Sequence, residues 1–541
     1  MDAKTQKYDR QLRLWGNTGQ NALEAAHILL VNATAVGCEI LKNLVLPGIG
    51  QFTVVDAGQV TLSDIGSNFF LDSDSLGQSR AQKAHEHLQE LNEDVKGHWV
   101  AKDIASILDE NPGYLAQFSL VIATNVTRQT AEKLAALCWN NGRDEKEGGY
   151  QSPAGKKETT FVWVKTVGLV GSARLAVPEH VIVETHPDSI ADLRIDSPFP
   201  ELVDYGKWFN FETEDGLEFG HIPYVAILLK YIEEWKQQND GKMPSTYAEK
   251  NQLKANIRAG MRSPDDENFE EAINSVLRTC QPTVVPSSIK ELFNDPKCEN
   301  LTAESTNFWI LARSTRDFVN GQGSSGFLPL SGTIPDMKAQ SDSYVALQTM
   351  QVNTYKTKAK MDVQDVSRIV ESWLEKLGLA AGLIPLQEIE SFCKYSAFLK
   401  VIRYRSLQEE YQNPNTLQIA SWLSDPDSVF PYYVLLRASD SFYDDHGRYP
   451  GVGESWKEDV DHLHTNVTTL LQSLGAENDA VSKDLTHEIC RYGNEAVHNI
   501  ASFMGGVVSQ EIIKLITHQY IPMNNTFIFD GTRSVSAVFA L

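Results

Sequence analysis

The sequence lacks the features that mark membrane-spanning, secreted and zinc-bound proteins. It contains no run of eighteen apolar residues, and its first residues lack the apolar core of a secretory signal. We therefore expect neither a membrane span nor a signal peptide. The six cysteines are scattered without a C-x-x-C pair, so a metal site has no support. Such sparse use of cysteine suits a reducing compartment, the cytoplasm or the nucleus.

Positive charge is also in short supply. Lys and Arg number 48 against 71 Asp and Glu, which gives a net charge of -23. A field of this sign repels phosphate backbones, so we expect no binding to nucleic acid, and it favours basic partners. An excess of acidic residues can also serve only to keep a protein soluble, and that explanation stays open. The length of 541 residues predicts two or three domains.

Short apolar strands alternate with amphipathic helices in the first part of the chain. Strands are predicted over 27–31, 51–56 and 119–124, and helices over 36–46 and 79–91. This β-α-β-α-β order is typical of a parallel, doubly wound sheet of the Rossmann type. Strand patterns follow at 161–166 and 172–177. They return only after a helix near 507–516, at 526–529 and 535–539, and the intervening stretch is mostly helical.

The simplest organisation is one α/β domain that is split by a long, mainly α-helical insertion and completed by the C-terminus. On this interpretation residues 1–185 are its first part, 186–485 the insertion, and 486–541 its last part. A separate small C-terminal domain is the alternative.

The turn after the first strand lacks most of the glycines that a nucleotide-binding loop needs. In G-x-G-x-x-G the early glycines let backbone amides approach the phosphates at a helix N-terminus. Here residues 32–37 read N-A-T-A-V-G, and only Gly37 remains, the glycine required for close helix–strand packing. Asn32 and Thr34 place side chains where phosphates would lie, while Asp56 keeps the usual ribose-binding position. We predict a blocked site; a degenerate but working nucleotide site is the alternative. A nicotinamide-dependent oxidoreductase would need the same loop, so the sequence argues against that class of enzyme as well.

Three segments resemble one family, the activating enzymes of ubiquitin-like proteins. Residues 8–16 (YDRQLRLWG) resemble its Y-D-R-Q-x-R-L-W-G start, and residues 67–71 (SNFFL) are similar to its S-N-x-x-R-Q-F-L motif. Residues 501–514 resemble its G-G-x-x-x-Q-E-x-I-K helix. Further likeness inside the insertion is greatest to the regulatory subunits of neddylation-activating enzymes. The resemblance implies a Rossmann-like adenylation fold that is catalytically inactive.

Compared with active members, this chain lacks the groups that bind Mg-ATP. No arginine follows Asn68 in the S-N motif, Gly58 replaces a second acid, and Arg80 replaces a lysine. After the third apolar strand, where an aspartate normally binds magnesium, Asn125 and its neighbours offer no carboxylate. Adenylyl chemistry depends on a metal and on cations at the developing charge. The resemblance thus implies that this chain alone binds no cofactor or metal, and that ATP and Mg²⁺ bind in a partner subunit.

The same resemblance gives Arg10 a role in trans. Two adenylation-like halves pair across a pseudo-twofold axis, and the N-terminal arginine of one half reaches the ATP site of the other. An arginine suits a triphosphate because its planar fork makes bidentate contacts and its charge does not titrate away. A surface charge beside the Trp15 anchor is the alternative for Arg10.

The implied complex is a heterodimer with the catalytic subunit of a neddylation-activating enzyme. It would adenylate the C-terminal glycine of a Nedd/Rub-type modifier and load it as a thioester on the partner's cysteine. A conjugating enzyme would be met indirectly, and cullins would be the final targets. Alternatives are a free-standing adenylyltransferase and a non-catalytic scaffold of a related enzyme, such as the SUMO-activating one.

Two further predictions concern the insertion. Cys280 and Cys298 do not match the family's cysteine motif, so we expect buried, unreactive thiols. A segment after a Gly/Ser loop resembles the family closely enough to suggest contact with the catalytic subunit, although an ordinary turn is equally compatible. It consists of Gly332, Thr333, Ile334, Pro335, Asp336 and Met337.

Overall fold

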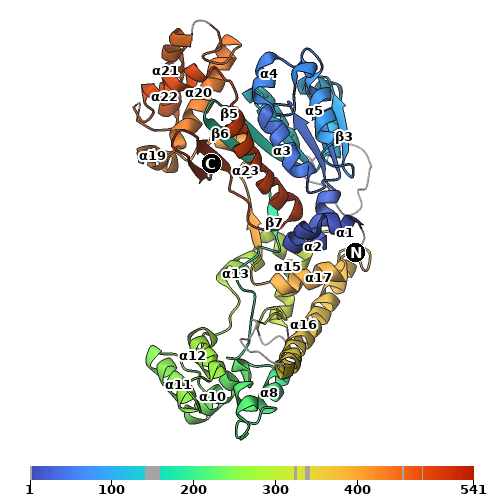
Figure 1. The fold of residues 1–541 in the computed structure, drawn as a ribbon, viewed down its shortest axis with the longest axis vertical. Helices are drawn as coiled ribbons and strands as arrows, with labels where there is room; N and C mark the ends of the chain where they lie inside the picture. Colours follow the sequence, from blue (N-terminus) through green and yellow to red (C-terminus); the bar gives the residue numbers. More distant parts are fainter. Residues whose placement is uncertain (1–2, 141–158, 322–325, 335–341, 454–455, 478) are drawn as a thin grey trace. The chain divides into compact units, whose positions relative to one another are not determined.

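The computed structural model describes residues 3–140, 159–321, 326–334, 342–453, 456–477 and 479–541 (Figure 1). The chain divides into two compact units. Unit 1 comprises Met1–Ile182 and Val401–Leu541, and unit 2 comprises Val183–Lys400. The chain therefore leaves unit 1, forms unit 2 and returns, so an insertion splits the first unit.

Unit 1 is built on an eight-stranded sheet in the order β10-β9-β6-β5-β4-β1-β2-β3. Neighbouring strands from β3 to β5 are parallel, and those from β5 to β10 are antiparallel. The strand bounds are β1 (His27–Val31), β2 (Gln51–Val55), β3 (Lys96–Val100), β4 (Leu120–Thr124), β5 (Thr160–Val167), β6 (Val170–Ala176), β9 (Thr526–Asp530) and β10 (Val535–Phe539).

The parts of the chain before and after unit 2 meet in this sheet. Strand β6 pairs with β9 in a register that places Val170 opposite Asp530. The prediction of one split α/β domain is thereby confirmed, and the alternative of a separate C-terminal domain is wrong. The strand β3 had no clear sequence signal, because it lies at the sheet edge and its side chains are mostly exposed.

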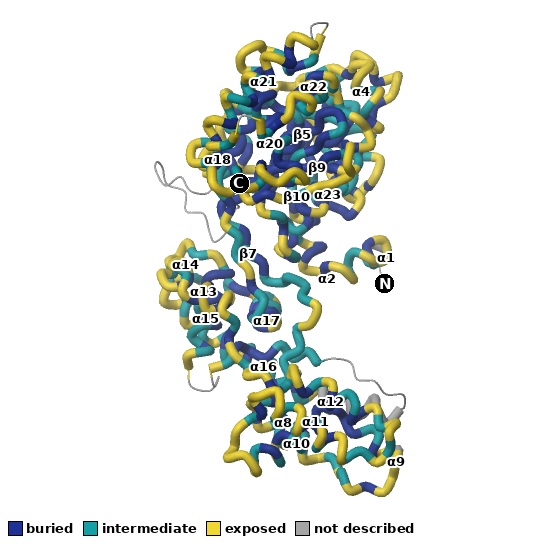
Figure 2. The backbone as a smooth tube through the Cα atoms, turned by 90° about the vertical axis from the view of Figure 1, so that its left-hand side faces the viewer, coloured by how far each residue is buried: buried dark blue, intermediate teal, exposed yellow. Residues whose placement is uncertain are grey.

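Helices cover both faces of the sheet, which is why the four residues of β1 that follow His27 are all apolar. Ile28 and Leu30 pack with residues of α3 (Ala35–Val45), α5 (Arg80–Gln89) and α23 (His498–Thr517). Leu29 and Val31 face the opposite layer, with α6 (Ile104–Glu110) and α7 (Arg128–Asn140). The central strands are buried between these layers (Figure 2). The other elements of residues 3–140 are α1 (Ala3–Lys7), α2 (Asp9–Glu24), α4 (Leu62–Ser67) and the 3₁₀ helices Ser73–Ser75 and Pro112–Gln117.

Helix α23 is long and apolar enough to cross a membrane by length and composition alone. In the structure, however, it packs along α3, and 61% of its apolar window is buried. Its Glu511 carboxylate accepts a hydrogen bond from the amide of Met523 at 2.7 Å. This helix is therefore a core element of unit 1.

The helices after residue 400 correct the predicted boundary at 485/486, because residues 401–485 belong to unit 1. The apolar faces of the last four of these helices form one core with the antiparallel half of the sheet, including Val170, Ile528 and Phe539. Leu407 of the first one packs instead in the layer of α6 and α7. Helical periodicity shows that a helix has an apolar face, but not which surface covers it. These helices are α18 (Leu407–Gln412), α19 (Thr416–Ser424), α20 (Phe430–His446), α21 (Trp456–Ser473) and α22 (Lys483–Tyr492).

Unit 2 is mainly helical, as predicted for the insertion. Its core includes Val225, Ile232 and Trp235, which recur at helical spacing and are buried. The helices are α8 (Pro200–Lys207), α9 (Gly216–Gly220), α10 (Tyr224–Gln238), α11 (Tyr247–Ala259), α12 (Glu267–Thr279), α13 (Ser287–Phe293), α14 (Pro296–Glu299), α15 (Asn307–Asn320), α16 (Asp342–Lys376) and α17 (Leu386–Tyr395). The short strands β7 (His180–Ile182) and β8 (Lys400–Ile402) pair where the chain leaves and re-enters unit 1.

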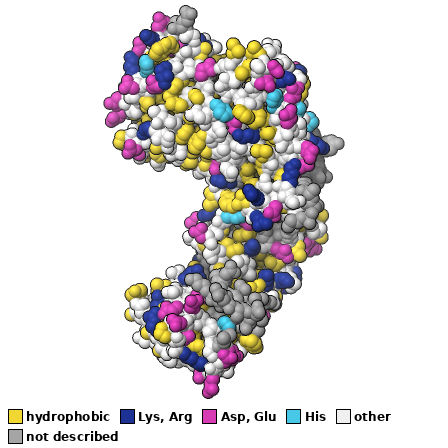
Figure 3. Space-filling view, in the orientation of Figure 1, with side chains coloured by type: hydrophobic (Ala, Val, Ile, Leu, Met, Phe, Trp, Pro, Cys, Tyr) yellow, Lys and Arg dark blue, Asp and Glu magenta, His cyan; other side chains and the backbone are white. Residues whose placement is uncertain are grey.

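The acidic excess is not gathered in one place on the face that Figure 3 shows. Acidic and basic side chains are interspersed there among the described residues. The net charge of -23 therefore does not by itself mark a binding surface on this face.

Candidate functional site

The turn between β1 and α3 is closed by its own hydrogen bonds. Asn32 has a φ of 66°, a left-handed conformation that asparagine tolerates better than most residues. Its amide N–H donates to the carbonyl of Val55 at 2.9 Å, and its Nδ2 donates to the carbonyl of Thr124 at 3.2 Å. The side chain at the first loop position thus ties β1 to β4 instead of leaving space for a phosphate.

Thr34 caps α3 and occupies the third loop position. Its hydroxyl accepts a hydrogen bond from the amide of Gly37 at 3.3 Å and donates to Thr124 Oγ1 at 2.8 Å. Thr124 Oγ1 in turn donates to the carbonyl of Asn32 at 2.7 Å. An amide at a helix N-terminus is the kind of donor that binds phosphate, and here the amide of Gly37 already has a side-chain acceptor.

Gly37 has the packing role that the sequence predicted. A Cβ at this position would lie 2.9 Å from Leu30 Cδ1 and 3.1 Å from both the carbonyl oxygen of Asn32 and Thr124 Oγ1. Helix α3 can approach β1 and β4 this closely only because the position carries no side chain.

Gly37→Ala is therefore expected to destabilise unit 1 by about 1–3 kcal/mol, the usual effect of overpacking a tight core. Urea denaturation of the chain measures the change in free energy of unfolding. Gly66→Ala is a matched control, because a Cβ at Gly66 would have no neighbour within 4 Å. Equal stability of the two variants would contradict the close-packing role of Gly37.

Asp56, predicted to keep the ribose position, has its carboxylate fully engaged within the protein. The residue is 2% exposed. Its oxygens accept from the amides of Ala33 at 2.8 Å and Gly58 at 2.7 Å. They also accept from Arg80 Nε at 2.7 Å and Nη2 at 3.1 Å, a bidentate ion pair. With four donors bound, the carboxylate has little capacity left for a ribose hydroxyl.

Arg80, at the position where the resemblance led us to expect a lysine in an active enzyme, completes this cluster. Its Nη1 donates to Asp64 Oδ1 at 3.0 Å. Burial disfavours the charged guanidinium, but the hydrogen bonds and charges of Asp56 and Asp64 prevail and raise the pKa of Arg80 above its ordinary value. Gly58 makes room for the pair, since a Cβ there would lie 2.9 Å from Arg80 Nη2. The cation is thereby directed into the protein and away from any phosphate.

Asn68 also holds the turn, a role that sequence reasoning missed. It is 2% exposed, and its Nδ2 donates to the carbonyl of Ala33 at 3.2 Å and to Cys38 Sγ at 3.3 Å. The amide of Phe70 donates to Asn68 Oδ1 at 3.0 Å. The only sequence signal was its place in the S-N motif, which does not reveal a contact across 35 residues.

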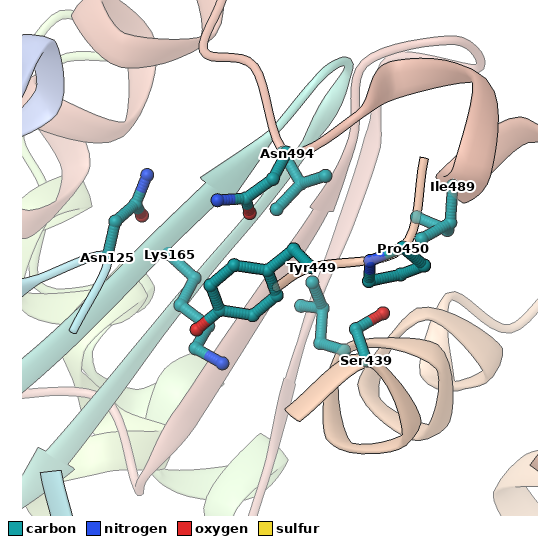
Figure 4. A pocket seen from close by; sticks show the side chains of 9 residues that line it. Asn125, Lys165, Ser439, Tyr449, Pro450, Ile489 and Asn494 are labelled. Atoms are coloured by element: carbon teal, nitrogen blue, oxygen red, sulfur yellow. The ribbon is translucent and has the colours of Figure 1, made fainter. Parts of the chain in front are cut away.

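At the carboxyl end of β4, the position expected to lack a magnesium ligand is occupied by an amide. Asn125 bridges to β5, because its Nδ2 donates to the carbonyl of Thr166 at 3.3 Å and its Oδ1 accepts from the amide of Thr166 at 3.0 Å. Asn125 lines a pocket with Lys165 and Tyr449 (Figure 4). Lys165 forms an ion pair with the buried Asp440, and no carboxylate is among the described residues that line this pocket. These residues do not fit a magnesium–nucleotide complex.

Arg10 lies on α2, away from this cluster of hydrogen bonds. Its side chain is exposed, and it has no hydrogen bond or ion pair with any other described residue. Arg13, one turn further on, forms an ion pair with Asp9 at 3.0 Å. Arg10 is thus the free cation of the N-terminal motif, and its predicted role in a partner's ATP site stays a prediction.

The remaining predicted positions lie in unit 2. Cys280 and Cys298 are buried, and burial raises the pKa of both thiols to about 11, so neither is poised as a nucleophile. Gly332, Thr333 and Ile334 are half-buried, with Ile334 packed against the core of this unit.

The predicted partner contact concerns a segment of which only the first half, residues 332–334, is described. Pro335, Asp336 and Met337 lie outside the described residues, so partner contact by the segment is untested. Within the described ranges, no group of three or more His, Cys, Asp or Glu side chains could hold a metal.

Comparison with known proteins identifies the family. Residues 8–190 match the ThiF family. The chain is 43% identical to the "NEDD8-activating enzyme E1 regulatory subunit" of Danio rerio over 100% of this chain and 99% of that protein. It is also 43% identical to the protein of that name from Gallus gallus, covering 99% and 98% of the two chains. Identity to "NEDD8-activating enzyme E1 regulatory subunit AXR1" of Arabidopsis thaliana is 38%, covering 99% and 96%. The chain belongs to the family of NEDD8-activating enzyme E1 regulatory subunits.

Proposed function

We propose that this chain is the non-catalytic half of a heterodimeric enzyme that activates a NEDD8-type modifier. The catalytic partner binds ATP and Mg²⁺, adenylates the C-terminal glycine of the modifier and carries it as a thioester. This chain pairs with that partner and contributes Arg10 to its ATP site. The heterodimer works in the cytoplasm, the nucleus or both, passes the modifier to a conjugating enzyme, and involves neither nucleic acid nor a membrane.

The observation that carries this proposal is the closed turn at residues 32–37. Three of its amides, those of Asn32, Ala33 and Gly37, donate to acceptors within the protein. Asp56 is saturated by Arg80 and two amides. Holding Mg-ATP here would require breaking a buried ion pair and several buried hydrogen bonds, which would cost several kcal/mol before any gain from the nucleotide.

A second line of support is the contrast between the complete fold of the α/β unit and its altered site. The fold of an adenylating domain is complete, with an eight-stranded sheet and helices on both faces. The site differs from one that could bind Mg-ATP in the loop 32–37, in the carboxylate of Asp56, which is already bound within the protein, and at the residues after β4. Retention of the scaffold without the site is what a pairing role requires, because a pseudo-symmetric partner recognises the fold and not the nucleotide.

The direct test is ATP–pyrophosphate exchange measured for this chain alone, for the catalytic subunit alone and for the co-purified heterodimer. We expect the chain alone to show no exchange and no heat of Mg-ATP binding by calorimetry, and the heterodimer to show full activity. Exchange by the isolated chain would instead support a free-standing adenylyltransferase. Failure to co-purify with the catalytic subunit of a neddylation-activating enzyme, combined with pairing to the SUMO-activating one, would reassign the modifier.

A further inference from the structure

Two buried aromatic side chains hold the first half of α2, and Arg10 lies between them. Tyr8 is 2% exposed, and its hydroxyl accepts from Asn92 Nδ2 at 3.0 Å and donates to Asp94 Oδ2 at 3.1 Å. Trp15 is 8% exposed. The two positions are about two helical turns apart and therefore share one face, so the segment is anchored on that side while Arg10 stays exposed.

The segment that carries Arg10 ends at a sharp bend. Gly16 has φ 65° and ψ −177°, a conformation that essentially only glycine adopts, and it interrupts α2. A Cβ at Gly16 would have no neighbour within 4 Å, so glycine is required for its backbone conformation and not for space. Because the helix is not continuous across Gly16, the second half of α2 does not by itself fix the direction of the first.

Hydrogen bonds to Trp15 fix that direction instead. The interruption leaves the last carbonyl groups before the bend in need of donors. Gln519, which follows α23 and is 3% exposed, donates from Nε2 to the carbonyl of Trp15 at 2.9 Å. The side chain of Trp15 is held as well. Its indole N–H donates to Gln20 Oε1 at 3.1 Å, and Gln20 Nε2 donates to the carbonyl of Pro47 at 3.1 Å.

We propose that Gln519 is a positioning residue for Arg10. By holding the Trp15 carbonyl next to the Gly16 bend, it sets the direction in which the arginine is presented to the partner's ATP site. This inference rests on the proposed function. It assigns to a residue near the C-terminus a part in a reaction that takes place in another subunit.

The test uses the full heterodimer carrying Gln519→Glu. This change keeps the size of the side chain, removes the donor and turns a carboxylate oxygen toward the Trp15 carbonyl. We expect pyrophosphate exchange to fall about tenfold, a typical consequence of misplacing a catalytic group. Hydrogen exchange of the amides of residues 9–15 should rise in the same variant. Asn268→Asp is the matched control, since Asn268 Nδ2 is a buried donor to the carbonyls of Phe219 and Ile222, both at 3.0 Å, in unit 2.

A double-mutant cycle separates positioning from general destabilisation. If Gln519 acts through Arg10, Gln519→Glu lowers exchange in the wild-type background but not in Arg10→Ala. An equal loss in both backgrounds, or no loss in either, overturns the inference. Unchanged exchange in Arg10→Ala itself instead overturns the proposed role of Arg10. Should Gln519→Glu fail to fold, Gly16→Ala replaces it in the same cycle, because it strains the bend without a steric clash.

Discussion

Arg10→Ala is expected to slow adenylate formation by the heterodimer about 10²-fold or more, the scale seen when an arginine supplied in trans is removed. The reason is that a guanidinium stabilises the negative charge on the triphosphate. ATP–pyrophosphate exchange at saturating modifier measures the effect. Because Arg10 is exposed and makes no hydrogen bond or ion pair with another described residue, the stability of the chain should not change.

Arg13→Ala is the natural control for this experiment. Arg13 lies in the same motif, is 77% exposed and is paired with Asp9, so its removal should leave exchange nearly unchanged. Arg10→Lys should recover only part of the rate, since an ammonium lacks the planar fork. If Arg10→Ala behaves like Arg13→Ala, the chain acts only as a scaffold for its partner.

Asp56→Ala is expected to lower the free energy of unfolding by about 3–5 kcal/mol, because it leaves the guanidinium of Arg80 half-buried without its bidentate partner. The amides of Ala33 and Gly58 lose their acceptor in the same variant. Urea denaturation, followed by tryptophan fluorescence and by circular dichroism, measures the loss. If the carboxylate serves a ribose and not the fold, the variant will be nearly as stable as the wild type.

Two comparisons sharpen this experiment. Glu86→Ala removes the partner of Lys83 in a more exposed ion pair on the same helix as Arg80, and should lower stability by no more than about 1 kcal/mol. Combining Asp56→Ala with Arg80→Met removes the unpaired cation, so the double variant should be more stable than Asp56→Ala alone. A double variant less stable than the single one would show that Arg80 supports the fold through Asp64.

Much of the fold could be predicted because its central strands are buried on both faces. Such strands read as short apolar runs, and β1, β2 and β4 were placed to within a residue or two of their bounds. Strand β3 was missed because Lys96–Val100 lies at the sheet edge, where half-exposed side chains carry no such pattern. The helices of residues 401–485 were recognised as helices but placed in the wrong unit, since periodicity does not identify the surface that covers an apolar face.

The candidate site likewise has features that the sequence predicted and features that it did not. Loss of the early glycines at Asn32 and Thr34 was visible from the sequence, and so was the packing role of Gly37, because both follow from the local backbone requirements of the turn. What Asp56 does was not visible. Its partner Arg80 lies 24 positions away, and only the folded chain brings the two together.

The antiparallel pairing of β6 with β9 also affects how the molecule is made. A ribosome makes β6 well before β9, with all of unit 2 in between. Until then β6 offers an unpaired edge, a template on which nascent chains can stick together. Completion of the sheet therefore has to wait until all of unit 2 and the residues up to β9 have been made.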